Sequence, residues 1–238
     1  MNETVTKFEK VKKKYALNNS YFKNRTNSMP SNPMEIMQYY KEHNDLPFDM
    51  GTDTSNWLYE CYIEFQKRSG VYNSQFFTPP KTAIRMYEIG EDYFDLSENV
   101  LDACSGFGML SKPFIVNGYT IEAFDYSSDM MQLYKDNFNC EYCTQLNFLE
   151  QEFADNYYNI ISNPPYEVPA LTSFLNWIYE NMPETGVAVL LIPKGFLDKE
   201  RPKAIPEIVS KFKILHREDM QEDFARTKIR AEIVVLKK

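Results

Sequence analysis

The tetrapeptide Asn163-Pro164-Pro165-Tyr166 directly follows the apolar run at residues 157–162. A proline cannot donate to a β-ladder and holds its φ near about −65°, so two in succession must turn the chain out of a sheet. The resulting loop is stiff and leaves its carbonyl groups free. Asn163 adds a side-chain acceptor, the backbone carbonyl of Pro164 can add another, and Tyr166 presents a flat ring. This set of groups is suited to holding a planar amino group.

Such a loop can assist chemistry at the exocyclic nitrogen of adenine. The lone pair of that nitrogen is delocalised into the ring, and two acceptors on its hydrogens favour a more tetrahedral, more nucleophilic nitrogen. No covalent enzyme intermediate is then needed. The alternative interpretation is an ordinary rigid turn with a surface tyrosine, because Asn and Pro are common turn residues.

A second group of residues follows two earlier apolar runs. Asp102 precedes a loop that contains Gly106 and Gly108, and Asp125 ends the next run about 20 residues further on. Glycines let a ligand lie against the backbone, and an acid in this position accepts hydrogen bonds from ribose hydroxyls. The loop lacks the third glycine of the dinucleotide fingerprint and the Lys-Ser/Thr of a phosphate loop, which favours a nucleoside. Alternatively, Asp102 is an ordinary capping residue at a strand end.

The elements that must position these groups follow an α/β pattern. Short apolar runs alternate with helical stretches from residue 99 onward, which predicts a mostly parallel sheet with helices on both faces. In such a sheet, ligands bind at the carboxyl ends of the strands, where both groups of residues fall. The predicted strands lie near residues 100–104, 119–124, 141–144, 157–162, 187–192, 214–216 and 231–236. The predicted helices cover residues 109–117, 129–138, 171–182 and 203–212.

Another helix is predicted to start at Pro80, because proline suits the first turn of a helix. Ala83, Ile84 and Tyr87 recur at helical spacing and are expected to face the core, with Met86 as a further candidate. Thr78 is a candidate cap for this helix.

Composition limits the possible classes of protein. The chain of 238 residues is 43% hydrophobic, which is enough for one substantial core, and it carries a net charge of −8. This acidity argues against a large non-specific nucleic-acid surface, although a basic amino-terminal arm could contact phosphates. The sequence has no apolar run of about 20 residues and no signal-peptide pattern, which predicts a cytoplasmic protein without membrane contact. Its four cysteines are interpreted as free thiols, with no metal site.

The motifs together resemble the N6-adenine DNA methyltransferases that use S-adenosylmethionine, particularly the modification subunits of type I restriction systems. The resemblance covers roughly residues 70–238 and rests on motif order. It implies a Rossmann-like class I methyltransferase fold with a seven-stranded sheet over residues 71–238, preceded by a polar, helical extension over residues 1–70. The family's catalytic loop corresponds to Asn163, Pro164, Pro165 and Tyr166.

Cofactor and substrate sites also follow from this resemblance. The segment Gln75–Pro80 corresponds to the one that closes over the methionine part of S-adenosylmethionine, with Phe77, Thr78 and Pro79 as the cofactor-binding candidates. Asp102, Gly106, Gly108 and Asp125 correspond to the cofactor loop and the ribose-binding acid. Phe196 is a weaker substrate-binding candidate, in a segment that resembles the family's Pro-x-Gly stretch. No metal is implied.

Two features depart from the family pattern. Asn147 stands where the family commonly has an Asp that contacts the cofactor's adenine amino group, so weaker cofactor discrimination is expected. A separate target-recognition domain is also not expected in this chain. Recognition of the target DNA sequence is therefore expected to depend on the first 70 residues, a short insertion, or a specificity or partner subunit. The implied function is N6-adenine methylation of DNA, as in restriction-modification. The alternatives are methylation of an RNA base or a protein glutamine, and a catalytically silent cofactor-binding subunit.

Overall fold

The computed structural model describes residues 76, 78–106, 108–138, 142–148, 157–198, 203–220, 224 and 229–238. The chain divides into two units, Met1–Gln75 and Phe76–Lys238, and all described residues belong to the second. The expected extension over residues 1–70 lies outside the described residues and stays a prediction.

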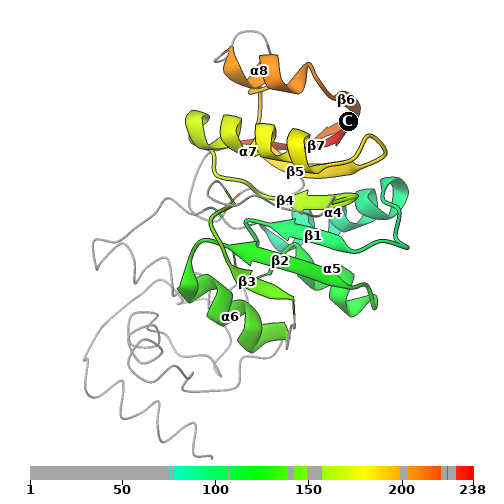
Figure 1. The fold of residues 1–238 in the computed structure, drawn as a ribbon, viewed down its shortest axis with the longest axis vertical. Coiled ribbons are helices and arrows are strands. Elements are labelled where there is room, and N and C mark those ends of the chain that lie inside the picture. Colours follow the sequence, from blue (N-terminus) through cyan, green and yellow to red (C-terminus); the bar gives the residue numbers. More distant parts are fainter. Residues whose placement is uncertain are drawn as a thin grey trace, which may run out of the picture. The chain divides into compact units, whose positions relative to one another are not determined.

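The second unit is built on a seven-stranded sheet with the strand order β3-β2-β1-β4-β5-β7-β6 (Figure 1). All pairs from β3 to β5 are parallel, whereas β7 runs antiparallel to both β5 and β6. This confirms the expected mostly parallel sheet. The strands are β1 (Val100–Ala103), β2 (Ile121–Asp125), β3 (Cys143–Gln145), β4 (Asn159–Ser162), β5 (Val187–Pro193), β6 (Lys213–Asp219) and β7 (Ala231–Lys237).

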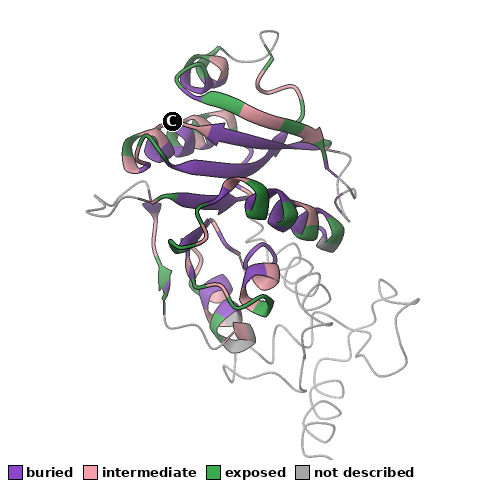
Figure 2. Ribbon diagram, turned by 90° about the vertical axis from the view of Figure 1, so that its right-hand side faces the viewer, coloured by how far each residue is buried: buried purple, intermediate pink, exposed green. Residues whose placement is uncertain are grey.

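Helices cover both faces of the sheet, and this explains why the central strands are apolar at successive positions. Alternate residues of a strand enter two separate hydrophobic clusters: Val189 joins the first, whereas Leu190 joins the second. The first cluster lies under α4 (Pro80–Tyr93), α5 (Ser111–Val116) and α6 (Ser128–Phe138), and the second under α7 (Val168–Asn181) and α8 (Ala204–Val209). Figure 2 shows the central strands buried throughout.

Helix α4 begins at Pro80 as predicted, but two details differ. Its N-cap is Pro79, and no side chain caps it. Ala83, Met86 and Tyr87 face the core, whereas Ile84 is 51% exposed. The spacing of Ile84 from Ala83 places it about 100° around the helix, beyond the buried stripe.

The cysteines also differ from expectation in one respect. Cys104 is a free thiol, but Cys143 is disulfide-bonded, so the prediction of four free thiols is wrong for Cys143. The other two cysteines, Cys61 and Cys140, lie outside the described residues.

The register of the sheet fixes what lies at its carboxyl edge. Ala103 of β1 pairs with Phe124 of β2 and with Ser162 of β4, so these three strands end nearly level. Ser162 in turn pairs with Leu190 of β5, which continues for three more residues to Pro193. The segment that begins at Asn163 therefore leaves the sheet between the glycine loop and the projecting end of β5.

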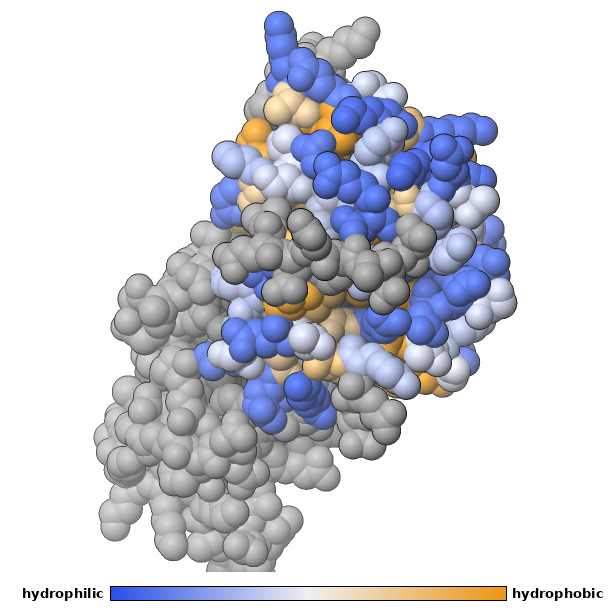
Figure 3. All heavy atoms as spheres, viewed as in Figure 1, coloured by the Kyte–Doolittle hydropathy of each residue, from blue (hydrophilic) through white to orange (hydrophobic). Residues whose placement is uncertain are grey.

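Within the described residues, no helix is both long and apolar enough to cross a membrane. Figure 3 shows that hydrophilic side chains cover most of the described surface on the face viewed there.

Candidate active site

The amide of Asn163 has a defined orientation. Its Nδ2 donates a hydrogen bond to the backbone carbonyl of Phe76 at 2.6 Å. A carbonyl can only accept, so the amide nitrogen must face Phe76 and Oδ1 must face the other way. This Oδ1 is buried and has no hydrogen-bond partner among the described residues. A buried acceptor without a partner is costly, and a donor from a ligand would satisfy it.

Tyr166 lies in an aromatic cluster made by three distant parts of the sequence. Its ring stacks on Phe76, with 5.6 Å between centroids and 20° between planes, and meets Phe224 edge-on at 6.0 Å. Tyr166 is only 9% exposed and belongs to the hydrophobic core, so the alternative of a surface tyrosine is wrong. Burial raises the pKa of its hydroxyl well above the usual value, so the ring stays neutral.

The start of the Asn163–Tyr166 tetrapeptide is fixed to the sheet. The Ser162 hydroxyl donates to the carbonyl of Ala103 in β1, and Pro164 is buried. Helix α7 starts directly after the tetrapeptide, with Glu167 as its N-cap and a proline in its first turn. Asn163 and Tyr166 are thus held between a strand end and a helix start.

Asp102 is completely buried at the end of β1. Its Oδ2 accepts a hydrogen bond from the Ser111 hydroxyl at 2.5 Å, whereas Oδ1 has no hydrogen-bond partner among the described residues. Burial raises the pKa of Asp102 to about 7, with a further contribution from the charge of Asp125. The carboxyl group would be stabilised in its ionised form by a cation or a hydrogen-bond donor.

Asp125 holds the glycine loop in place. Its Oδ2 accepts from the Gly106 amide at 3.0 Å, and its Oδ1 accepts from the Ser127 amide at 2.9 Å. Burial raises its pKa to about 6. Each carboxylate oxygen has a further lone pair, so Asp125 can accept from a ligand as well.

Gly108 has a role different from the one expected from the sequence. A side chain there would not meet open space for a ligand: a Cβ atom would lie 2.3 Å from the Phe138 ring and 2.8 Å from the Tyr134 ring of α6. Its φ of 98° also favours glycine. The missing side chain is therefore required by packing of the loop against α6.

The remaining predicted site residues do not all lie together. Thr78 and Pro79 are buried before α4, and Asn147 follows β3 at the same carboxyl edge as the glycine loop. Phe196 packs against the cluster under α7 and α8, whereas Tyr166 belongs to the cluster under α4, so the two rings lie on opposite faces of the sheet. Phe77 lies outside the described residues.

Two residues of the site were not predicted from the sequence: Phe224 and Ser111. Phe76 falls within the predicted cofactor segment, but nothing local indicates that its carbonyl reaches Asn163, 87 residues away in the chain. Ser111 lies nine residues after Asp102, at the start of α5, and such a position could have been found as a partner for the buried acid.

Among the described residues, no group of three or more His, Cys, Asp or Glu side chains is placed to hold a metal ion.

The buried acids lead to a prediction on pH. Asp102 has a higher pKa in the folded protein than the ordinary 3.8, so the folded state binds its proton more tightly than the unfolded state. The stability that this contributes is complete below about pH 4 and is lost as the pH rises to about 7. Relative to Asp102→Asn, which cannot ionise, the wild type is expected to lose free energy of unfolding between these pH values in urea titrations. The exposed Asp92→Asn serves as the control, and a pH-independent difference between wild type and Asp102→Asn would contradict the prediction.

Comparison with known proteins shows which fold this is. No protein-family model matches the sequence, and no curated protein matches it. Solved structures do match. A protein assigned as an RNA methyltransferase from Pyrococcus horikoshii superposes with a TM-score of 0.59 and 18% identity, over 69% of this chain and 87% of that one.

Two further structures extend the comparison. A modification subunit assigned to a type I restriction enzyme from Vibrio vulnificus YJ016 gives a TM-score of 0.54 and 16% identity, over 85% of this chain and 53% of that one. An S-adenosylmethionine-dependent methyltransferase from Clostridium acetobutylicum ATCC 824 gives a TM-score of 0.53 and 11% identity, over 75% of this chain and 98% of that one. The described unit therefore has the Rossmann-like fold of these methyltransferases.

Proposed function

We propose that this protein transfers a methyl group from S-adenosylmethionine to the N6 amino group of adenine in DNA. The observation that carries the proposal is the oriented amide of Asn163, whose buried Oδ1 has no hydrogen-bond partner among the described residues. It stands at the carboxyl end of β4, next to the glycine loop that follows β1. An acceptor at that place suits the hydrogen of an amino group.

The residues around the glycine loop fit S-adenosylmethionine. This molecule carries a sulfonium, an ammonium group and two ribose hydroxyls, and both Asp102 and Asp125 retain acceptor capacity in a buried setting. We assign the ribose to Asp125 and the positively charged end to Asp102, with Gly106 and Gly108 shaping the loop between them. Thr78, Pro79 and Asn147 complete the proposed contacts, together with Phe77 outside the described residues. When bound, the cofactor supplies an activated methyl group.

Asn163 and its neighbours would act on the acceptor nitrogen. Its Oδ1 accepts one hydrogen of the target amino group, and the Pro164 carbonyl accepts the other, which directs the nitrogen lone pair out of the ring plane. As the nitrogen becomes positive during transfer, these oxygens stabilise the developing charge. Pro165 keeps the loop stiff, so alignment of donor and acceptor costs little reorganisation.

A base in a duplex cannot reach a buried loop, so the target would be flipped out and stacked on Tyr166. The base would have to displace the Phe76 ring, which stacks on Tyr166 in this structure. This displacement need not affect Asn163, because the hydrogen bond to Asn163 involves the Phe76 backbone and not its ring. The chain has a net charge of −8, which disfavours binding to phosphates, so a specificity or partner subunit is expected to supply much of the affinity for DNA.

An RNA base is the second candidate acceptor, since the Pyrococcus horikoshii structure carries that assignment. A protein glutamine fits the same two acceptors, and the acidity of the chain favours it over nucleic acid. The buried position of Tyr166 favours the last candidate, a silent subunit that binds cofactor without transfer.

Isotope transfer separates these candidates. The full chain is incubated with S-adenosylmethionine labelled on the methyl group and with unmethylated DNA, RNA or a protein extract, alone and beside candidate subunits from its genomic neighbourhood. Label recovered as N6-methyladenine in DNA is the expected result. Label confined to RNA or to protein glutamine would replace the proposed acceptor, and cofactor binding without any transfer would replace the proposed activity.

A further inference from the structure

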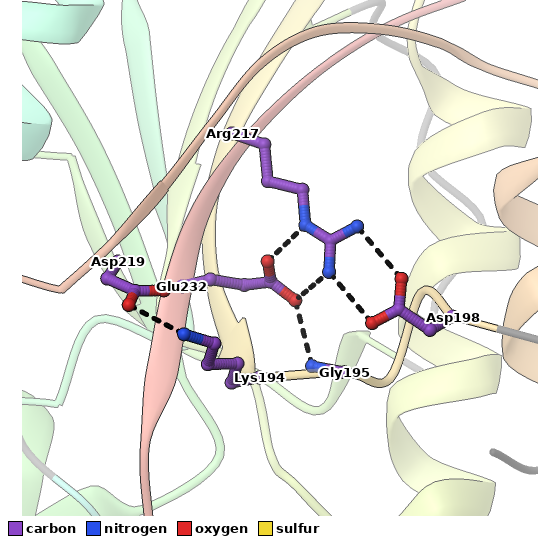
Figure 4. Close-up of polar contacts among 6 residues, drawn as sticks. All are labelled: Lys194, Gly195, Asp198, Arg217, Asp219 and Glu232. Atoms are coloured by element: carbon purple, nitrogen blue, oxygen red, sulfur yellow. Dashed lines mark hydrogen bonds and ion pairs between the residues drawn. The ribbon is translucent and has the colours of Figure 1, made fainter. Parts of the chain in front are cut away.

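The loop after β5 is held by charged side chains from β6 and β7 (Figure 4). The carboxylate of Glu232 is 3% exposed and accepts hydrogen bonds from the Gly195 amide, at 3.1 Å, and from the Arg217 guanidinium. The same guanidinium donates to both oxygens of Asp198, each at 3.1 Å. Arg217 therefore joins a buried carboxylate in the sheet to an exposed carboxylate in the loop.

The start of this loop is fixed as well. The Lys194 amide donates to the Arg230 carbonyl at 2.9 Å, and its Nζ lies 2.6 Å from Asp219 Oδ2. At Gly195 the chain takes a φ of 80°, a left-handed conformation that favours glycine. Both ends of the segment 194–198 are thus attached to the antiparallel strands β6 and β7.

The position of this segment relates it to the proposed target. The strand β5 continues three residues past its last pairing with β4, at the point where Asn163 leaves the sheet. Segment 194–198 therefore leaves the sheet at the same carboxyl edge as the loop of residues 163–166, on the β5 side of β4. The cofactor contacts proposed above come from the ends of β1, β2 and β3, on the other side of β4, and from the residues just before α4. A displacement of segment 194–198 should consequently disturb the target and spare the cofactor.

We infer that Arg217, with Glu232 and Asp198, forms a clamp that positions segment 194–198 for binding of the nucleic-acid target, an inference that rests on the proposed function. Arg217 is a positioning residue, since its own contacts are to carboxylates of the protein. The planar fork of arginine can bridge two carboxylates, whereas lysine offers a point charge. Partial burial of the network makes it less sensitive to salt than a surface pair.

A matched control lies on the same strand. Glu218, next to Arg217, points to the other face of the sheet and forms a two-pronged ion pair with Arg85 of α4, at 2.8 and 2.9 Å. Arg85→Met and Arg217→Met each remove one arginine that holds a carboxylate of the sheet. Only the second removes a tie to segment 194–198.

The kinetic test compares these variants in the methyl-transfer assay. Arg217→Met is expected to raise the KM for DNA by about tenfold or more and to leave the KM for S-adenosylmethionine unchanged. Arg217→Lys should restore only part of the loss. Asp198→Asn, which leaves the buried pair intact, should show a smaller change in the same direction. An equal rise in Arg85→Met, or a rise in the cofactor KM instead, would overturn the inference.

Hydrogen exchange tests the clamp without any activity. The Gly195 amide donates to a buried carboxylate, so peptides covering residues 194–198 should exchange slowly in the wild type and at least about tenfold faster in Arg217→Met. Arg85→Met should leave this exchange unchanged. If the wild type transfers no methyl group, the proposed function fails, but hydrogen exchange still decides whether the clamp holds segment 194–198. Unchanged exchange in Arg217→Met would refute the clamp.

Discussion

Replacing Asn163 by alanine is expected to lower the rate of methyl transfer by about 10²- to 10³-fold while S-adenosylmethionine binds as in the wild type. The substitution removes the buried Oδ1, which is the acceptor assigned to the target amino group, and leaves Asp102 and Asp125 at the ends of β1 and β2 in place. Transfer is measured with labelled cofactor at saturation, and cofactor binding by calorimetry.

Asn176 in α7 supplies the control for this experiment. Its Nδ2 also donates to a backbone carbonyl, that of Thr172 at 3.0 Å, but it belongs to the middle of a helix. Asn176→Ala should retain normal transfer. If Asn163→Ala transfers methyl groups at the wild-type rate with normal cofactor binding, the assignment of the catalytic loop fails.

Replacing Gly108 by alanine is expected to lower the free energy of unfolding by about 2 to 5 kcal/mol. Two costs add: a left-handed backbone conformation for a residue with a side chain, and a Cβ atom placed 2.3 Å from the Phe138 ring. Urea denaturation monitored by circular dichroism measures the change. Binding of cofactor should weaken as well, because the loop carries the Gly106 amide that Asp125 holds.

Gly118 separates the two costs. It also has a positive φ, of 85°, but a Cβ atom there meets nothing within 4 Å. Gly118→Ala should therefore lose only about 1 to 2 kcal/mol, from the backbone term alone. Equal losses in the two variants would show that packing against α6 contributes nothing at Gly108.

The sequence predicted the parts of this unit that depend on local pattern. Buried strands such as Val187–Pro193 consist almost wholly of apolar residues, and a proline marks the start of α4. The order of strand ends with Asp102, Asp125 and Asn163 also follows from parallel topology alone. These features need no knowledge of contacts between distant segments.

The missed features depend on such contacts. Ile84 is more apolar than Ala83, yet Ala83 is buried and Ile84 is exposed, because the position of the helix on the sheet decides which residue is covered. The network around Arg217 joins this residue to Glu232 and Asp198, which are 15 and 19 positions away on a neighbouring strand and in a loop. From residue type alone, charged side chains are predicted to be exposed to solvent. Gly108 was interpreted as ligand-facing because the sequence does not reveal that α6 places two aromatic rings beside it.

The stacked pair of Phe76 and Tyr166 has a thermodynamic consequence for recognition. A planar target that reaches Tyr166 replaces one aromatic neighbour with another, so the stacking gained is largely offset by the stacking given up. Affinity at this position then depends on the difference between two similar terms, and discrimination falls to the hydrogen bonds that only the correct amino group can make. The hydrogen bond to Asn163 comes from the Phe76 backbone, so a rotation of the Phe76 side chain need not break it. Under the proposed function, non-target bases are therefore expected to be held weakly, which would favour rapid sampling of many sites before one is modified.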